Sequence, residues 1–106
     1  MIEVWVRRDG GKITAYRVEG HAGWAQAGRD IACAAVSALV VGTENGLDEV
    51  AGAVKESRSS DGKLEVELKQ ELGEEARIMA DAILETMLNA LRKIEIQHPR
   101  TVRIYD

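Results

Sequence analysis

The chain has 106 residues, of which 45% are apolar and 30% are charged. This size and balance predict a single compact domain over residues 1–106 and exclude an intrinsically disordered chain. Fourteen basic and eighteen acidic residues give a formal net charge of −4. Because no dense Lys/Arg cluster accompanies this acidic balance, we expect no direct binding to nucleic acid.

The distribution of apolar residues also bears on location. The opening MIEVWVRRDGG alternates apolar and charged residues, unlike the apolar core of a signal peptide. The longest apolar stretch, residues 31–42, is too short and too rich in alanine to span a bilayer. We therefore expect a cytoplasmic protein that makes no contact with a membrane.

The first twenty residues have the pattern of a β-hairpin. Ile2, Val4 and Val6 alternate with residues that would point to the opposite face of a strand. The Asp9-Gly10-Gly11 segment that follows tolerates the positive φ angles of a tight turn. A second strand over residues 12–18 completes the predicted hairpin.

A loop and a helix come next. The segment HAGWAQAGR, residues 21–29, is rich in glycine and alanine and has no apolar period, which is typical of a connecting loop. Asp30 is a favoured N-cap residue, so a helix is expected to begin directly after it. Residues at helical spacing form one expected buried stripe on this helix: Ile31, Ala35, Leu39, Gly42, Gly46 and Val50.

The second half of the chain repeats the order of hairpin and helix. The Asp61-Gly62 turn joins two expected strands over residues 53–59 and 63–70. A long amphipathic helix follows, with acidic residues at its start and basic residues near its end, and His98-Pro99 stops it. Its apolar stripe consists of Ala76, Ala80, Ile83, Leu84, Met87, Leu88, Leu91 and Ile94. Residues 102–105 can form a short last strand.

This order, ββαββα with a short C-terminal strand, predicts an α+β two-layer sandwich. Two hairpins imply a mostly antiparallel sheet, and two helices with one apolar stripe each can cover one of its faces. Trp5 falls on the strand face opposite Ile2 and Val4, so apolar surface is expected on the uncovered side. A large exposed apolar patch usually marks an interaction surface, which predicts a homodimer.

Reactive side chains are concentrated in the segment VEGHAGWAQAGRDIACAAVS, residues 18–37. It contains His21, one of two histidines, and Cys33, the only cysteine. If Asp30 is the N-cap, Cys33 lies in the first helical turn, where unpaired N–H groups and the helix dipole favour a thiolate. His21 at the strand end is then close enough in the chain to act as its base. Ser37, one turn after Cys33, would orient His21 or bond back to the helix carbonyl of Cys33.

Other interpretations of these residues stay open. From spacing alone, Cys33 fits better as a small buried residue of an alanine-rich helix, and His21 as an exposed loop residue. His21, Cys33 and His98 lack the paired spacing that zinc sites show. The glycines of the segment lack the lysine and spacing of a phosphate-binding loop. We therefore expect neither a metal nor an organic cofactor.

The motif Gly20-His21-Ala22-Gly23, followed by Gly28 and by Asp30-Ile31-Ala32-Cys33-Ala34-Ala35-Val36-Ser37, resembles the signature of the ribosomal-processing cysteine protease family Prp. The order of expected elements also fits this family over nearly the whole chain. The resemblance implies a small homodimeric cysteine endopeptidase that removes the N-terminal extension of a bacterial large-subunit ribosomal protein, the twenty-seventh.

The resemblance also implies roles for individual residues. By motif position, His21 corresponds to the base and Cys33 to the nucleophile of a His-Cys dyad that acts through a thioester. Gly20, Gly23, Asp30 and Ser37 correspond to supporting or substrate-binding positions, and residues 22–29 to a flexible loop. Two alternatives remain: a non-enzymatic ribosome-associated module that binds peptides or assists assembly, and another thiol acyl hydrolase or transferase that uses the same two residues.

Overall fold

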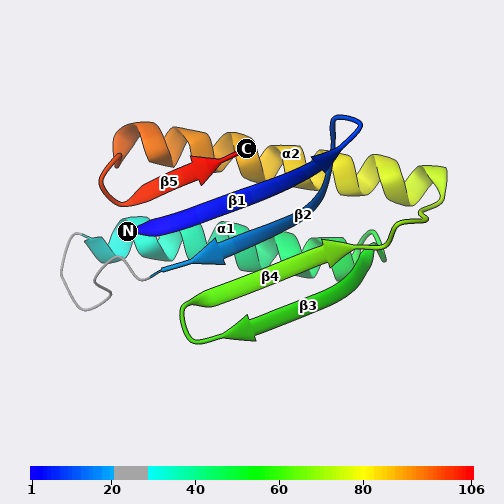
Figure 1. Ribbon diagram of the computed structural model, residues 1–106, viewed down its shortest axis with the longest axis horizontal. Helices are drawn as coiled ribbons and strands as arrows, with labels where there is room; N and C mark the ends of the chain where they lie inside the picture. The colour runs from blue at the N-terminus through cyan, green and yellow to red at the C-terminus, as the bar shows by residue number, and fades with distance from the viewer. Residues whose placement is uncertain (21–28) are drawn as a thin grey trace.

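The seven elements of the chain follow the predicted order (Figure 1). The computed structural model describes residues 1–20 and 29–106, with the backbone alone at Arg29 and Asp30. The predicted α+β class is confirmed. The elements are β1 (Ile2–Asp9), β2 (Lys12–Glu19), α1 (Arg29–Glu49), β3 (Val54–Ser60), β4 (Lys63–Leu68), α2 (Glu74–Gln97) and β5 (Val102–Tyr105).

The strands form one five-stranded sheet in the order β3-β4-β2-β1-β5. The pairs β1–β2, β2–β4 and β3–β4 are antiparallel, whereas β5 runs parallel to β1 at the edge. A parallel pair needs a crossover connection, because its second strand must start at the same end as the first. The path through β2 to α2 carries the chain back to that end. Both helices lie behind the same face of the sheet in Figure 1, so the fold has two layers.

The core lies between the sheet and the helices. Whereas the edge strand β3 buries none of its residues, strands β1, β2 and β4 bury residues on one face, with Ile2 and Val4 of β1 at 2% and 0% exposure. This is the period-two pattern of strands with one covered face. Helix α2 buries the stripe that its sequence predicts, including Leu84 and Leu91 at 0% exposure. The buried residues of α2 are Ala80, Leu84, Met87, Leu88 and Leu91.

The buried face of α1 differs from the prediction. Ile31 and Val50, at the two ends of the expected stripe, are 74% and 66% exposed. Nearly every position between residues 31 and 41 is apolar, so periodicity alone cannot select one face. The residues that α1 buries against the sheet are Ala32, Cys33, Val36, Val40, Thr43 and Leu47.

Helix α1 has apolar residues on its exposed side as well as on its buried face. By length and composition, Ile31–Glu49 is able to cross a membrane, and the same test is passed by core helices of soluble proteins. Here α1 covers the sheet beside α2. Gly46 faces Ile83 of α2, and a Cβ at this position would make an ordinary van der Waals contact, 3.7 Å, with the Cδ1 atom of Ile83.

The uncovered sheet face is mainly polar. Trp5 stacks on Tyr105 with ring centroids 5.4 Å apart, and the Arg17 guanidinium lies 4.2 Å from the Trp5 ring centroid. Charged pairs such as Arg7 with Glu67, at 2.9 Å, surround this stack. Trp5 lies on this face as predicted, but the expected broad apolar patch is reduced to one aromatic pair. The sheet therefore does not supply the apolar surface on which the homodimer prediction rested.

The ends of α2 agree only in part with the predicted charge pattern. Glu74 and Glu75 occupy its first turn, where the helix dipole favours acidic groups. The last turn contains no basic residue. Arg92 instead pairs with Asp106 at 2.8 Å and so connects the helix to the residue that follows β5. The helix ends at His98, as the His98-Pro99 pair predicts.

Candidate active site

A groove of about 780 Å³ lies between α1 and the β3–β4 hairpin. Concave sites that bind small ligands typically measure about 300–1,000 Å³, so this groove can hold several side chains of a bound peptide. Gly20 and Ser37, two of the predicted site residues, both line it. The described residues that line it are Ile2, Val18, Gly20, Val36, Ser37, Val40, Val41, Ser59, Ser60, Asp61, Gly62, Lys63 and Leu64.

The inner wall of the groove is apolar and firmly held. Ile2, Val18 and Leu64 come from three neighbouring strands and are buried. On β2, the hydroxyl of Tyr16 donates a hydrogen bond of 2.8 Å to the carbonyl of Val40 in α1. Burial raises the pKa of Tyr16 well above its usual range, with a smaller contribution from Glu44, so the hydroxyl stays a donor at neutral pH. This bond holds α1 against β2 along the groove.

Gly20, which lines the groove, has a backbone conformation and a close contact that require glycine. Its φ angle is +106°, a conformation that residues with a side chain rarely adopt. A Cβ at this position would also overlap the carbonyl oxygen of Met1 and lie 3.3 Å from the Met1 carbonyl carbon. The Gly20 N–H donates a 2.9 Å hydrogen bond to the carbonyl of Gly62 in the β3–β4 turn. The chain therefore leaves β2 toward residue 21 along a closely packed path.

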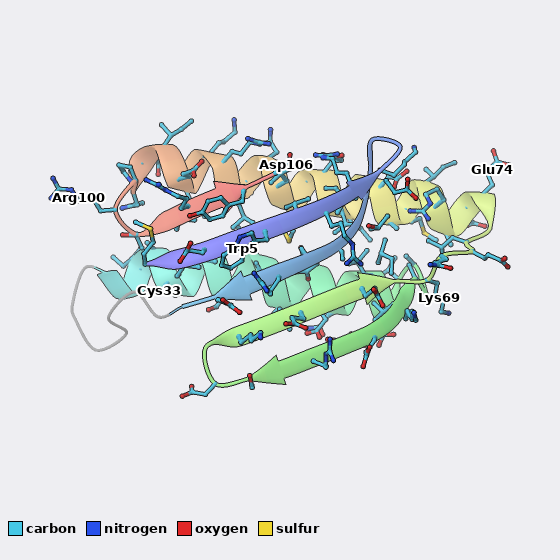
Figure 2. All side chains as sticks on the ribbon, in the orientation of Figure 1. Trp5, Cys33, Lys69, Glu74, Arg100 and Asp106 are labelled. Atoms are coloured by element: carbon cyan, nitrogen blue, oxygen red, sulfur yellow. The ribbon has the colours of Figure 1, made fainter. Side chains whose placement is uncertain are left out.

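Cys33 lies near the start of α1 (Figure 2). It is 0% exposed and belongs to the hydrophobic core. This agrees with the structural interpretation of Cys33 as a small buried residue, and it differs from the expectation of a thiol open to substrate. Ser37, which lines the groove, is half-buried one turn further along the same side of α1, whereas Cys33 is not among the residues that line the groove.

The predicted N-cap is wrong by at least one residue. Helix α1 begins at Arg29, so Asp30 lies inside the first turn and Cys33 is the fifth helical residue. The first four N–H groups of an α-helix have no partner within it, and these now belong to residues 29–32. Helical side chains lean toward the N-terminus, so the Cys33 side chain is directed toward this turn. An acidic residue at position 30 remains favourable there because of the helix dipole.

Several predicted site residues cannot be placed. His21, Gly23 and the predicted loop, apart from Arg29, lie outside the described residues. The side chain of Asp30 also lies outside them. Of the predicted set, Gly20 and Ser37 line the groove, whereas Cys33 is buried in the core one turn before Ser37 in α1.

The hairpin side of the groove carries a local charge network. The ammonium of Lys63 lies 3.1 Å from Glu65 and 3.4 Å from Glu19. Hydrogen bonds to Glu65 and then to Glu19 raise the pKa of Lys63, while the bond from Lys63 is the largest cause of a lowered pKa at Glu65. Lys63 is exposed and the two carboxylates are only partly buried, so these ion pairs contribute little to the stability of the fold. Within residues 1–20 and 29–106, no group of three His, Cys, Asp or Glu side chains is arranged to hold a metal ion.

Comparison with known proteins identifies the family. The family model described as cysteine protease Prp matches residues 1–103. The chain belongs to the cysteine protease Prp family. It is 32% identical over 107 residues to the ribosomal processing cysteine protease Prp of Bacillus subtilis, a match that covers 98% of this chain and 96% of that protein. This membership makes the chain a cysteine protease, as its sequence motif indicates.

Solved structures of Prp proteins share the fold. The ribosomal processing protease Prp from Staphylococcus aureus, in complex with a covalently linked product peptide, has a TM-score of 0.83 at 30% identity, covering 99% of this chain and 98% of that chain. The same protease with a substrate peptide has a TM-score of 0.81 at 28% identity, with 100% of both chains covered. SMU.848 from Streptococcus mutans has a TM-score of 0.84 at 26% identity, covering 99% and 92%.

Sequence reasoning missed most of the groove. It assigned Val36, Val40 and Val41 no place in the site, although all three line the groove. The hairpin residues 59–64 were expected only as a turn and flanking strands. The available signal was the Asp61-Gly62 turn, which predicts where the hairpin bends but not that it bends beside α1.

Proposed function

We propose that this Prp-family protease cleaves a peptide bond by nucleophilic attack from Cys33. The supporting observation is simple: the chain is a cysteine protease and contains one cysteine. His21, the other residue of the proposed dyad, would accept the thiol proton. Gly20, which lines the groove, directly precedes His21 in the chain. The restricted backbone of Gly20 would therefore hold the backbone of His21 near the groove.

The proposed reaction has two stages. The Cys33 thiolate attacks the carbonyl carbon of the scissile bond, and the protonated His21 donates its proton to the leaving amine. The C–N bond breaks and a thioester forms. A water molecule then attacks the thioester carbonyl while His21 accepts a proton, and this step releases a carboxylate and returns the proton to the thiol. Unpaired N–H groups in the first turn of α1 can stabilise the oxyanion that precedes each bond cleavage.

Burial adds a requirement to this mechanism. Because the Cys33 sulfur is 0% exposed, it must become accessible before a carbonyl carbon can reach it. We propose that substrate binding in the groove accompanies this opening, with Gly23, Asp30 and Ser37 in supporting positions around it. Local opening of a small segment costs far less than global unfolding, so the requirement is compatible with a stable fold.

The proposed substrate is the N-terminal extension of a bacterial large-subunit ribosomal protein, the twenty-seventh. The relatives from Bacillus subtilis and Staphylococcus aureus bear the name ribosomal processing cysteine protease, and the Staphylococcus aureus structures contain substrate or product peptides. These names support a peptide of ribosomal origin as the substrate class. We place the activity in the cytoplasm, where ribosomal proteins are made.

The decisive experiment incubates the protein with the extended ribosomal protein and measures intact masses. A shortened product with the wild type, and none with Cys33→Ala, Cys33→Ser or His21→Gln, supports the proposal. Val50→Ala is a matched control on an exposed residue directly after α1 and should retain full cleavage. Circular dichroism checks that each variant folds, because Cys33→Ser places a hydroxyl in the core.

Three outcomes would contradict the proposal. Full cleavage by the Cys33→Ala variant would show that Cys33 is not the nucleophile. A stable complex at unchanged mass would favour a module that binds peptides without cleaving them. Transfer of the acyl group to an acceptor other than water would favour a thiol acyltransferase.

We also propose that the protein acts as a homodimer. The surface that supports this is on α1, where Ile31 is 74% exposed and the neighbouring Ala34 and Ala38 are exposed as well. Light scattering at micromolar concentration is expected to give twice the mass of 11.6 kDa. A stable monomer mass would rule the dimer out.

A further inference from the structure

Helix α1 presents one accessible apolar side chain to the groove. Val36 and Val40 line the groove, but at 1% and 4% exposure they are committed to the core. Val41 lines the same groove and is 45% exposed. It is therefore the apolar group of α1 that a bound chain would contact most fully.

The groove is bridged just beyond Val41. The Ser57 hydroxyl of β3 donates a hydrogen bond to the carboxylate of Glu44 in α1. Because α1 and β3 form the two sides of the groove, this contact joins the sides on the turn that follows Val41. At the end formed by Gly20 and Gly62, the Gly20 N–H donates a 2.9 Å hydrogen bond to the Gly62 carbonyl, which joins the end of β2 to the β3–β4 turn.

The length between these ends is set by helix geometry. Cys33 and Val41 are eight residues apart, which corresponds to about 12 Å along an α-helix. An extended peptide advances about 3.3 Å per residue. A chain that passes Cys33 at its scissile bond therefore brings about its fourth residue level with Val41.

We propose that Val41 is a specificity-determining residue, which selects an apolar substrate side chain about four residues from the scissile bond, and that the Glu44–Ser57 bridge ends the recognised segment there. The inference rests on the proposed function, because it places the scissile bond at Cys33. Desolvating a charged substrate side chain against Val41 would weaken binding, since Val41 provides no hydrogen-bond partner.

The test compares kcat/KM for peptides that carry Leu or Lys at the third, fourth and fifth positions on either side of the cut. For the wild type, Lys at one of these positions should lower kcat/KM by about tenfold, mainly through KM. Val41→Asp should lose this preference for Leu and favour Lys at the same position. Val50→Asp is the matched control, because Val50 is 66% exposed and does not line the groove. If Val41→Asp and the wild type have the same preference, the inference is wrong.

Two further measurements separate the possible failures. Val41→Ala replaces Val41→Asp if the aspartate variant does not fold, and it should reduce the preference for Leu about threefold. If the wild type cleaves none of the peptides, the proposed function fails.

Binding of the Leu and Lys peptides is then compared by fluorescence anisotropy on the wild type and the Val41→Asp variant. A preference for Leu that the substitution removes supports the groove assignment, and equal binding rejects it. Ser57→Ala removes the Glu44–Ser57 bridge, so substrate residues further from the cut than the one at Val41 should also affect kcat/KM in this variant. If the preference at every substrate position is the same as in the wild type, the bridge does not limit the recognised segment.

Discussion

The carbonyl group of Met1 occupies the space that a Cβ on Gly20 would need, so the residue before β1 packs closely on the residue that follows β2. Gly20 combines this contact with a φ of +106°. Both constraints exclude a side chain. The same contact therefore fixes the backbone of the residue that directly precedes the proposed base.

We predict that Gly20→Ala lowers both stability and cleavage. Strained backbone at such a position costs about 1–3 kcal/mol, and the clash with Met1 adds to this cost. Gly11→Ala is a matched control, since Gly11 has a φ of +82° but nothing within 4 Å of an added Cβ. Urea unfolding should show a larger loss for Gly20→Ala, and kcat should fall only in that variant. Equal losses of stability in both variants would show that the contact with Met1 is unimportant.

Burial predicts slow alkylation of Cys33 in the resting protein. A reagent must wait for local opening to reach a side chain with 0% exposure. Iodoacetamide should therefore modify Cys33 at least about tenfold more slowly in the folded protein than in the unfolded chain in urea. A Cys33→Ala protein that also carries Ile31→Cys serves as the control, because residue 31 is 74% exposed. Mass spectrometry that found equal rates at Cys33 in both states would show that the sulfur is accessible without opening.

We predict that Tyr16→Phe destabilises the fold by about 1 kcal/mol, the net contribution of a typical buried hydrogen bond. The substitution removes the 2.8 Å bond to the Val40 carbonyl. Tyr105→Phe is the matched control, because its hydroxyl donates to Glu3 at 2.9 Å on an exposed surface. Its effect on urea unfolding should be smaller. A larger loss for Tyr105→Phe would contradict the importance of the contact between β2 and α1.

The Asp106 carboxylate predicts a pH-dependent contribution to stability. Hydrogen bonding from Arg8, at 2.8 Å, is the largest cause of its lowered pKa, and Arg92 contributes as well. Because the pKa is lower in the folded state, the ionised carboxylate stabilises the fold fully at pH values above the ordinary aspartate pKa of about 3.9. This stabilisation is lost as the pH falls from that value through the lowered pKa of the folded state. Asp106→Asn should therefore cost about 1 kcal/mol at pH 7 and progressively less below about pH 4.

Thermal unfolding of wild type and Asp106→Asn between pH 2 and pH 8 measures this difference. Glu71→Gln, an exposed change in the connection from β4 to α2, controls for a general loss of negative charge. A difference between wild type and Asp106→Asn that stays constant over the whole range would show that the Arg8–Asp106 pair does not contribute through the ionised carboxylate.

The order of secondary-structure elements was predictable because its signals are local. The Asp61-Gly62 turn lies between β3 and β4, and the apolar stripe of α2 is the one that packs in the core. The face of α1 was not predictable, because apolar residues occupy nearly every position at its start. Packing of α1 in the core buries Val36 and Leu47 and leaves Ile31 exposed.

The candidate site was predictable only where its members are neighbours in the chain. Gly20, Cys33 and Ser37 belong to one short motif; Gly20 and Ser37 line the groove, and Cys33 lies in the core one helical turn before Ser37. Val41 and the hairpin residues carry no such motif. Their part in the groove arises from packing between segments that are far apart in sequence.

By itself, the sequence determined the strands, turns and helices of this protein and the residues suited to thiol chemistry, because alternation, turn preference and residue type are properties of short segments. Only the tertiary structure decided that the Cys33 sulfur is buried, that Met1 closes on Gly20, and that β3 meets α1 through Ser57 and Glu44. These outcomes depend on how a sheet and two helices share one core, and no local pattern contains that information.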